Sequence, residues 1–125
     1  MWQCGSVLMS GKKLSDAAVQ HFHQQLNAGQ YEEIYNEADD GFRSGETHEN
    51  IVKFLEAVHK KLGNSRDTDF VNIRVNATTN GTFTTTIYNT TFDGGPSSET
   101  FTWVKSSGNL KLYSYNIESK ALIMN

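Results

Sequence analysis

The sequence predicts an α+β domain in which three N-terminal helices pack on a curved, four-stranded antiparallel meander sheet. Up to Gly63, apolar residues recur every three or four positions, as on one face of a helix. After Gly63 the period falls to about two, and Thr, Val, Ile, Phe and Tyr replace the helix-forming residues. Because the helices come first and hairpin-linked strands follow, an α+β layout is favoured over an alternating α/β one.

The length and charge limit the organisation and the partners. A chain of 125 residues is sufficient for one domain, which we place at 15–119 between a flexible N-terminal tether at 1–13 and a C-terminal tail at 120–125. The net charge of −3 lacks the basic excess of a nucleic-acid-binding surface, so no nucleic-acid partner is expected. Apolar runs are too short to cross a bilayer.

The first helix is predicted at 15–28. Ser15 followed by an aspartate is a helix-start signal, and Ala18, Phe22 and Leu26 then recur at four-residue steps. Asn27-Ala28-Gly29 ends this pattern, because glycine and asparagine favour a helix terminus.

Two further helices follow. Residues 30–38 carry a short amphipathic pattern closed by Asp39-Asp40-Gly41. Thr47 opens a longer helix, and Gly63 ends it as a C-terminal cap.

Three turns divide the rest of the chain into four strands. Asn80-Gly81 favours a type I′ hairpin turn, because both residues tolerate positive φ. Asp93–Pro96 and Ser106–Asn109 supply the second and third turns. The strands are therefore expected at about 67–79, 82–92, 98–105 and 109–118.

The expected register places apolar side chains on both faces of the sheet. With Asn80-Gly81 as the loop, Val75 opposes Thr86, and opposed residues share a face. In the first hairpin one face then holds Val71, Ile73, Val75, Ala77, Tyr88 and Phe92, and the other holds Phe70, Arg74, Phe83 and Ile87. In the last hairpin the two sets are Phe101, Trp103, Leu110 and Leu112, and Val104, Tyr113, Tyr115 and Ile117. The helices cover one face, and the other is either a homodimer or ligand surface or an ordinary Thr-rich solvent face.

With this order of helices and strands, the chain resembles the nuclear transport factor 2-like superfamily, which has a cone-shaped, cystatin-like fold. The resemblance spans about 15–119 and rests on the opening 17–31, the Phe42-Arg43 and Thr47 region, the helix end at 61–63 and the closing strand 110–117. More narrowly, the chain is similar to secreted or lipid-anchored bacterial families of unknown function. The resemblance implies a bacterial, extracytoplasmic protein.

The single cysteine supports two interpretations. Cys4 is followed by Gly5 and Ser6, as in a bacterial lipoprotein whose lipidated cysteine precedes a flexible tether. Lipid attachment at Cys4 predicts a periplasmic, membrane-anchored protein, in which the anchor is the membrane contact. Trp2-Gln3 does not fit a lipoprotein signal, and a free thiol on a cytoplasmic protein that begins at Met1 is the alternative.

Catalytic and metal-binding patterns are weak. Enzymes of the superfamily use Asp, His, Tyr or Arg side chains inside the cone, whereas here the acids, Asp67, Asp69, Asp93 and Glu99, are expected at or near strand ends. Asp40 beside a glycine turn fits a solvated cap. His21 and His23 point to different sides of a helix, and His48 and His59 lie too far apart, so each histidine is expected at the surface or a helix end. We therefore predict no catalytic residue, metal or cofactor.

Six aromatic residues are the candidate ligand pocket: Phe22, Tyr35, Phe54, Tyr88, Trp103 and Tyr113. Together they can line a small apolar cavity, although the same spacing also suits an ordinary core. We predict a non-enzymatic module that binds a small apolar ligand or a protein partner and forms a homodimer through a sheet face. The alternatives are a small cone-fold enzyme, an isomerase, dehydratase or hydrolase acting on an apolar substrate, and a cytosolic structural subunit.

Overall fold

The computed structural model describes residues 6–106 and 109–119, with side chains for 11–105 and 109–119. Four helices precede four strands: α1 (Ser6–Asn27), α2 (Tyr31–Glu37), α3 (Asp40–Ser44), α4 (His48–Leu62), β1 (Ser65–Thr78), β2 (Gly81–Phe92), β3 (Gly95–Ser106) and β4 (Asn109–Glu118). The strands form one antiparallel sheet in the order β1-β2-β3-β4. The predicted α+β class and the meander are confirmed.

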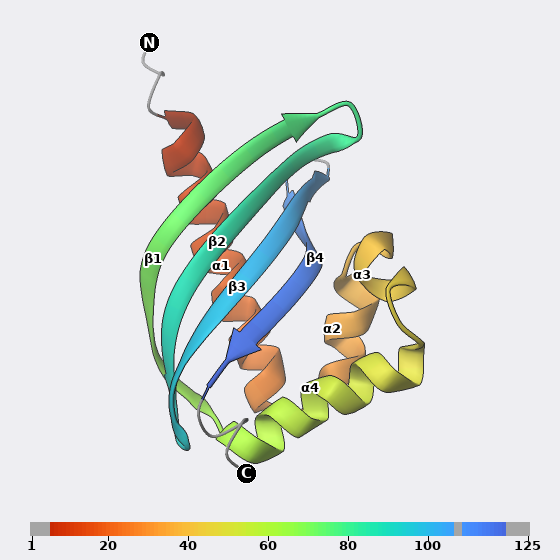
Figure 1. Cartoon of the computed structure of the whole chain (residues 1–125), viewed down its shortest axis with the longest axis vertical. Helices are drawn as coiled ribbons and strands as arrows, with labels where there is room; N and C mark the ends of the chain where they lie inside the picture. Colours follow the sequence, from red (N-terminus) through yellow and green to blue (C-terminus); the bar gives the residue numbers. More distant parts are fainter. Residues whose placement is uncertain (1–5, 107–108, 120–125) are drawn as a thin grey trace.

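The helices cover one face and one edge of the sheet. In Figure 1 the sheet curves, α1 crosses behind it, and α2, α3 and α4 gather beside the β4 edge. Among the described residues, β1 is therefore the edge strand that pairs with no strand on its outer side, and we call it the free edge of the sheet. None of the described helices is long and apolar enough to cross a bilayer.

Helix α1 begins earlier than predicted. It starts at Ser6, so residues 6–13, assigned above to a tether, belong to the helix. Ser15 is not a cap but a fully buried residue inside α1, where its hydroxyl donates to Thr86 Oγ1 at 2.9 Å. The cap prediction was wrong because a serine can also lie mid-helix when a partner outside the helix satisfies its hydroxyl.

The caps of α4 match the sequence prediction, whereas α3 was not foreseen. Thr47 Oγ1 accepts from the backbone N–H of Asn50 at 3.2 Å, and Gly63 follows the helix with φ 78°. Helix α3 has five residues, too few for an apolar period to show, and Asp39 caps it by accepting from the N–H of Gly41 at 2.9 Å. The predicted solvated turn is thus the start of a helix.

A bulge changes which residues of β1 face the core. Val75 pairs with Thr84 rather than Thr86, a two-residue difference that keeps Val75 on its predicted face. Between Phe70 and Asn72 the register shifts, so Phe70 pairs with Tyr88 and faces the core. Val71 is left 49% exposed. The faces predicted for Phe70 and Val71 were wrong because a bulge adds one residue to one strand and reverses the alternation.

A bulge in β4 likewise changes which of its residues face the core. Trp103 pairs with Leu112, but Thr102 pairs with Ser114, so Tyr113 is the extra residue. Tyr115 consequently faces the core, only 7% exposed, and Ile117 packs against the core as well. Both had been assigned to the opposite face.

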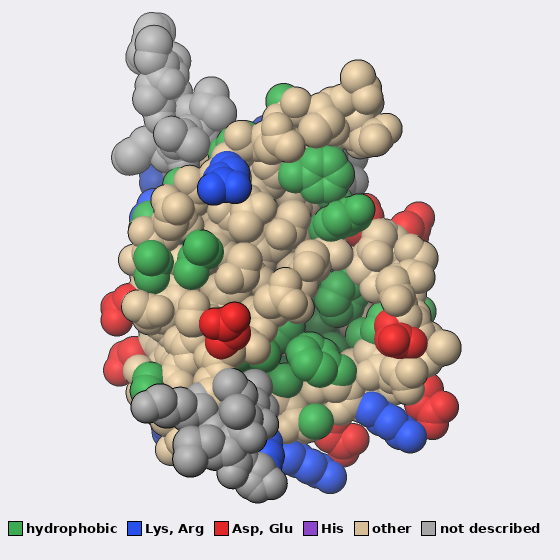
Figure 2. Space-filling view, in the orientation of Figure 1, with side chains coloured by type: hydrophobic (Ala, Val, Ile, Leu, Met, Phe, Trp, Pro, Cys, Tyr) green, Lys and Arg blue, Asp and Glu red, His purple; other side chains and the backbone are tan. Residues whose placement is uncertain are grey.

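The core lies between α1 and the inner face of the sheet. Phe101 is fully buried, stacks on Trp103 with ring centroids 5.3 Å apart and meets Phe22 edge-on at 5.2 Å. On the outer face, which Figure 2 shows, most of the sheet surface is Thr, Ser and Asn, and apolar side chains are scattered. The sheet therefore has one apolar face and one largely polar face with scattered apolar side chains, which fits the Thr-rich solvent face that was one of the expectations.

Candidate functional site

A buried carboxylate lies at the centre of the molecule. Glu99, in the middle of the inner face of β3, is 0% exposed. Its Oε1 accepts from Thr90 Oγ1 at 2.6 Å and from His23 Nε2 at 2.7 Å, and its Oε2 accepts from the Tyr115 hydroxyl at 2.6 Å. Because a buried carboxylate is stable only when its oxygens are satisfied, these three donors hold Glu99 in place.

The expectations for Glu99 and His23 were wrong. Glu99 is inside β3 because that strand begins at Gly95, and His23 is 6% exposed because α1 turns it toward the sheet. The sequence held a signal for both residues. Glu99 is two residues before the core residue Phe101, and His23 is four residues after the core residue Val19, so each shares a face with apolar neighbours.

The Tyr115 hydroxyl remains a proton donor to Glu99. Burial of the phenol, followed by the charge of Glu99 and the hydrogen bond to it, raises the pKa of Tyr115 well above its usual value. All three causes penalise the phenolate.

His23 connects Glu99 to an open cleft between α1 and β1. The α1–β1 cleft has a volume of about 470 Å³ and is lined by Lys12, Asp16, Val19, Gln20, His23, Gln24, Asn27, Ser65, Arg66, Thr68, Asp69, Phe70 and Tyr88. The second ring nitrogen of His23, Nδ1, lies 3.3 Å from Thr68 Oγ1. A carboxylate on one ring nitrogen and a cleft at the other is an arrangement that can orient an imidazole for proton transfer.

A second polar cluster borders the same cleft. The Tyr88 hydroxyl donates to Asp16 Oδ1 at 2.6 Å and lies 3.0 Å from Ser15 Oγ. Burial, followed by the hydrogen bond to Asp16, raises the pKa of Tyr88 above the ordinary range of a phenol. This cluster fixes the Asp16 carboxylate at the mouth of the cleft.

On the other side of Glu99, beyond Tyr115, lies an apolar hollow. It has a volume of about 430 Å³ and is lined by Phe42, Glu46, Asn50, Ile51, Phe54 and Tyr115. Figure 2 shows apolar side chains gathered in this region between β4 and the α3–α4 side of the molecule. Phe54 is 44% exposed although its ring lies 6.2 Å from that of Tyr115, so a large apolar surface stays open to solvent.

Three of the six predicted pocket residues are buried. Phe22 and Trp103 line a third groove, of about 320 Å³, between α1, α2 and β4, and their rings belong to the core. Tyr88 lines the α1–β1 cleft instead. These three side chains therefore do not converge on one cavity.

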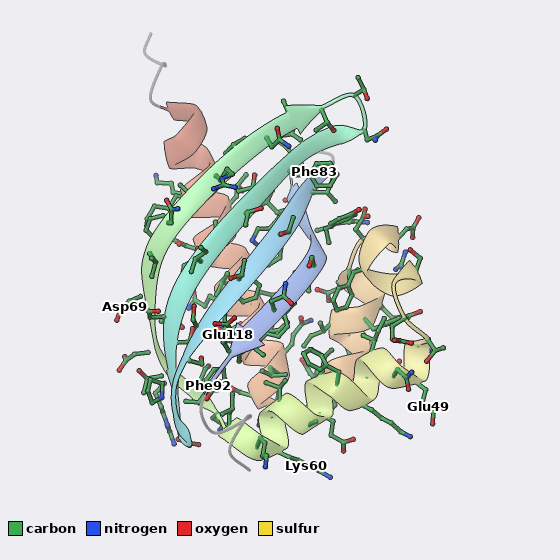
Figure 3. All side chains as sticks on the ribbon, in the orientation of Figure 1. Glu49, Lys60, Asp69, Phe83, Phe92 and Glu118 are labelled. Carbon is green, nitrogen blue, oxygen red and sulfur yellow. The ribbon has the colours of Figure 1, made fainter. Side chains whose placement is uncertain are left out.

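The other three are more exposed. Phe54 lines the apolar hollow, and the ring of Tyr113, 39% exposed, packs against Phe83 at 5.0 Å. Figure 3 shows Phe83 near the end of the sheet where β1 and β2 turn. Tyr35 stacks on His48 with ring centroids 4.0 Å apart. Cys4, the proposed lipid attachment point, lies outside the described residues.

The remaining candidates lie at the surface. His21 and His48 are exposed and pair with glutamates of α2 at 2.9 Å and 2.7 Å. Asp40 has a side chain 91% exposed and pairs with Arg43. Among the described residues, no group of three or more His, Cys, Asp or Glu side chains is arranged to hold a metal ion.

Comparisons with known proteins identify the family and the fold. Residues 18–115 match the family described as protein of unknown function (DUF4019). No curated protein matches the chain. A solved structure described as "Structure of Bdellovibrio bacteriovorus Bd1075" is similar with a TM-score of 0.53 at 13% identity, over 82% of this chain and 39% of that one. The chain therefore spans less than half of that protein, and the likeness at this identity is one of fold.

Proposed function

This chain belongs to the DUF4019 family, and we propose that it is a non-enzymatic module that binds a small, largely apolar molecule in the apolar hollow. The observation that carries the proposal is the exposure of Phe54, 44%, beside the buried ring of Tyr115. Large apolar side chains grouped around one depression on a domain surface often mark a binding site.

The size and the rim of the hollow favour a small molecule. A volume of about 430 Å³ suits a small ligand. Its wall is aromatic and aliphatic, and its polar edge is a local pair in which Asn50 Nδ2 donates to Glu46 Oε1 at 3.1 Å. A ligand with an apolar body and one hydrogen-bonding end matches this lining.

Native mass spectrometry of the gently purified protein tests the proposal. We expect a bound small molecule that leaves on denaturation and that is lost in Phe54→Ser. The matched control is Val71→Ser, because Val71 is also highly exposed, 49%, but lies outside the hollow. Retention of the same mass by Phe54→Ser, or an empty wild-type protein, would contradict the proposal.

A second candidate is a small enzyme that uses His23 as a general base. The observation that favours it is the position of His23, with Nε2 on Glu99 at 2.7 Å and the ring lining the α1–β1 cleft. Because the carboxylate fixes the ring, Nδ1 is the atom that would accept a proton from a substrate.

Kemp elimination of 5-nitrobenzisoxazole tests this candidate, because the reaction requires only a base beside an apolar aromatic substrate. The enzyme hypothesis predicts a rate above the buffer background that falls at least tenfold in His23→Gln but not in His48→Gln, whose histidine is exposed. Equal rates in all three proteins would exclude His23 as a general base for this probe.

Membership of the nuclear transport factor 2-like superfamily, a lipid anchor at Cys4 and an extracytoplasmic location remain proposals. So does a homodimer through the outer sheet face, and its support is weaker than the sequence suggested because Phe70 and Tyr115 face the core. The same mass spectrum reports this assembly: a monomer at micromolar concentration would exclude a stable dimer.

A further inference from the structure

The α1–β1 cleft already holds an ammonium group, that of Lys12. Lys12 Nζ lies 2.7 Å from Asp16 Oδ2 and 4.8 Å from the centroid of the Phe70 ring. A carboxylate and an aromatic face around one positive charge are the groups by which proteins recognise organic ammonium ions, because both attract a poorly hydrated cation.

The two recognition groups are held by other residues, not by Lys12. The Tyr88 hydroxyl donates to the second oxygen of Asp16 at 2.6 Å, and the Tyr88 ring meets Phe70 edge-on at 5.8 Å. The β1 bulge turns Phe70 to this side of the sheet. The carboxylate and the ring therefore keep their positions when the Lys12 side chain moves away.

The charge of the cleft also suits a cation. Besides Asp16, the lining includes Asp69, which Figure 3 shows projecting at the free edge of β1. On the same lining, the Arg66 guanidinium pairs with Asp93, and the His23 ring is hydrogen-bonded to the buried Glu99. Without Lys12, the cleft would present two carboxylates whose charge the paired Arg66 does not cancel.

The Lys12 ammonium is weakly held. The pair with Asp16 joins positions i and i+4 on the helix surface, and the two side chains are 42% and 41% exposed. Exposed pairs of this type stabilise a helix only slightly, so a competing cation can replace the lysine.

We infer that the α1–β1 cleft is a binding site for an organic ammonium ion and that Lys12 is a tethered occupant displaced by that ligand. A tethered group competes at a high effective concentration, so it lowers the apparent affinity for a free ligand. This site is separate from the apolar hollow, and its proposal does not depend on the ligand proposed there.

Choline, titrated against ¹⁵N-labelled protein at low ionic strength, is the probe. Lys12→Met removes the ammonium and keeps an apolar stem, and we expect it to bind choline about tenfold more tightly than the wild type, with amide shifts around Asp16 and Phe70. Lys13→Met is the matched control, because Lys13 is an exposed neighbour that does not line the cleft. Its affinity should equal that of the wild type.

The neutral alcohol 3,3-dimethylbutan-1-ol, which has nearly the shape of choline without its charge, separates charge from shape. We expect no saturable shifts with this alcohol, and we expect Phe70→Leu in the Lys12→Met background to lose the gain in choline affinity. Equal binding of the alcohol, equal choline affinity in Lys12→Met and Lys13→Met, or no choline shifts in Lys12→Met would overturn the inference.

Discussion

The two sides of Glu99 differ in chemistry although one carboxylate joins them. On the α1–β1 side, Glu99 reaches the surface through His23, and the cleft there is lined by charged and amide side chains. On the β4 side it bonds Tyr115, and the hollow beyond it is mainly aromatic and aliphatic. The difference shows that one layer of helix on sheet can offer a polar and an apolar depression around the same buried group.

The neighbouring elements explain this difference. The cleft lies at the free edge of the sheet, where β1 is largely exposed and carries Arg66, Asp67 and Asp69. Charged residues on an edge strand also oppose pairing with another sheet. Beside β4, helices α3 and α4 approach the strand instead, and the Asp39 N–H donates to the Leu112 carbonyl at 2.8 Å. Helix packing there leaves apolar side chains around the hollow.

Removal of the shared carboxylate should have the largest effect. Glu99→Ala leaves the donors on His23, Thr90 and Tyr115 without their acceptor and opens a cavity, so we expect a loss of about 3–5 kcal/mol in the free energy of unfolding. Urea denaturation measures it. Glu118→Ala, at an exposed position of β4, should change stability by about 0.5 kcal/mol or less. Similar losses for the two variants would mean that the hydrogen bonds of Glu99 do not stabilise the fold more than an exposed glutamate does.

The dependence of folding stability on alkaline pH tests the hydrogen bond between Tyr115 and Glu99. The folded state raises the pKa of Tyr115, so above pH about 10 the unfolded state loses this proton first and folding stability falls, by up to about 1.4 kcal/mol per pH unit. Below that pH the stabilisation is fully present. Tyr115→Phe should reduce the slope above pH 10 by about that amount. Tyr88, whose pKa is also raised, contributes a slope that Tyr115→Phe leaves unchanged. An unaltered slope in Tyr115→Phe would contradict the burial of its phenol.

A substitution of Gly41 tests the packing of α3 against β4, on the side of the apolar hollow. A Cβ at this position would overlap the Tyr113 ring, so Gly41→Ala must push that ring aside. We expect Gly41→Ala to cost about 1–3 kcal/mol, as overpacking does. Because the clash is with one side chain, adding Tyr113→Ala should remove most of the extra cost. Purely additive losses in thermal or urea unfolding would place the strain elsewhere.

The outer surface of α4 provides the smallest effect. Figure 3 shows Glu49 and Lys60 pointing away from the sheet, and the Lys53–Glu49 pair, at 3.3 Å, is 67% and 75% exposed. Glu49→Gln should therefore change the free energy of unfolding by about 0.5 kcal/mol or less. It should leave choline binding in the α1–β1 cleft and ligand binding in the apolar hollow unchanged. A larger change would mean that α4 influences the hollow through its solvent-facing side.

The sequence predicted the parts of the fold that local chemistry determines. The turns at Asp93–Pro96 and Ser106–Asn109, the Thr47 cap and the Gly63 terminus all depend on residues within a few positions. The bulges at Val71 and Tyr113 could not be predicted from spacing, because a bulge inserts one ordinary residue whose position only the pairing partner determines.

The candidate site was harder to predict than the fold. Glu99 was expected at or near a strand end and His23 at the surface or a helix end, because acids and histidines are mostly exposed. The two residues bond each other although they lie 76 positions apart in the chain. The spacing of Glu99 from Phe101 and of His23 from Val19 indicated that both side chains are buried. It did not indicate that Glu99 and His23 contact each other. The six aromatic residues do not all line one depression, because Tyr35 stacks on His48 of α4 and the position of Tyr113 is determined by the bulge in β4.

The most direct test of the central claim, that the apolar hollow is the ligand site, is an NMR titration of ¹⁵N-labelled protein with 8-anilinonaphthalene-1-sulfonate. The account predicts saturable shifts at Phe42, Ile51, Phe54 and Tyr115, which line the hollow, and their loss in Phe54→Ser. Shifts confined to the groove lined by Phe22 and Trp103, or no saturable shifts at all, would contradict it.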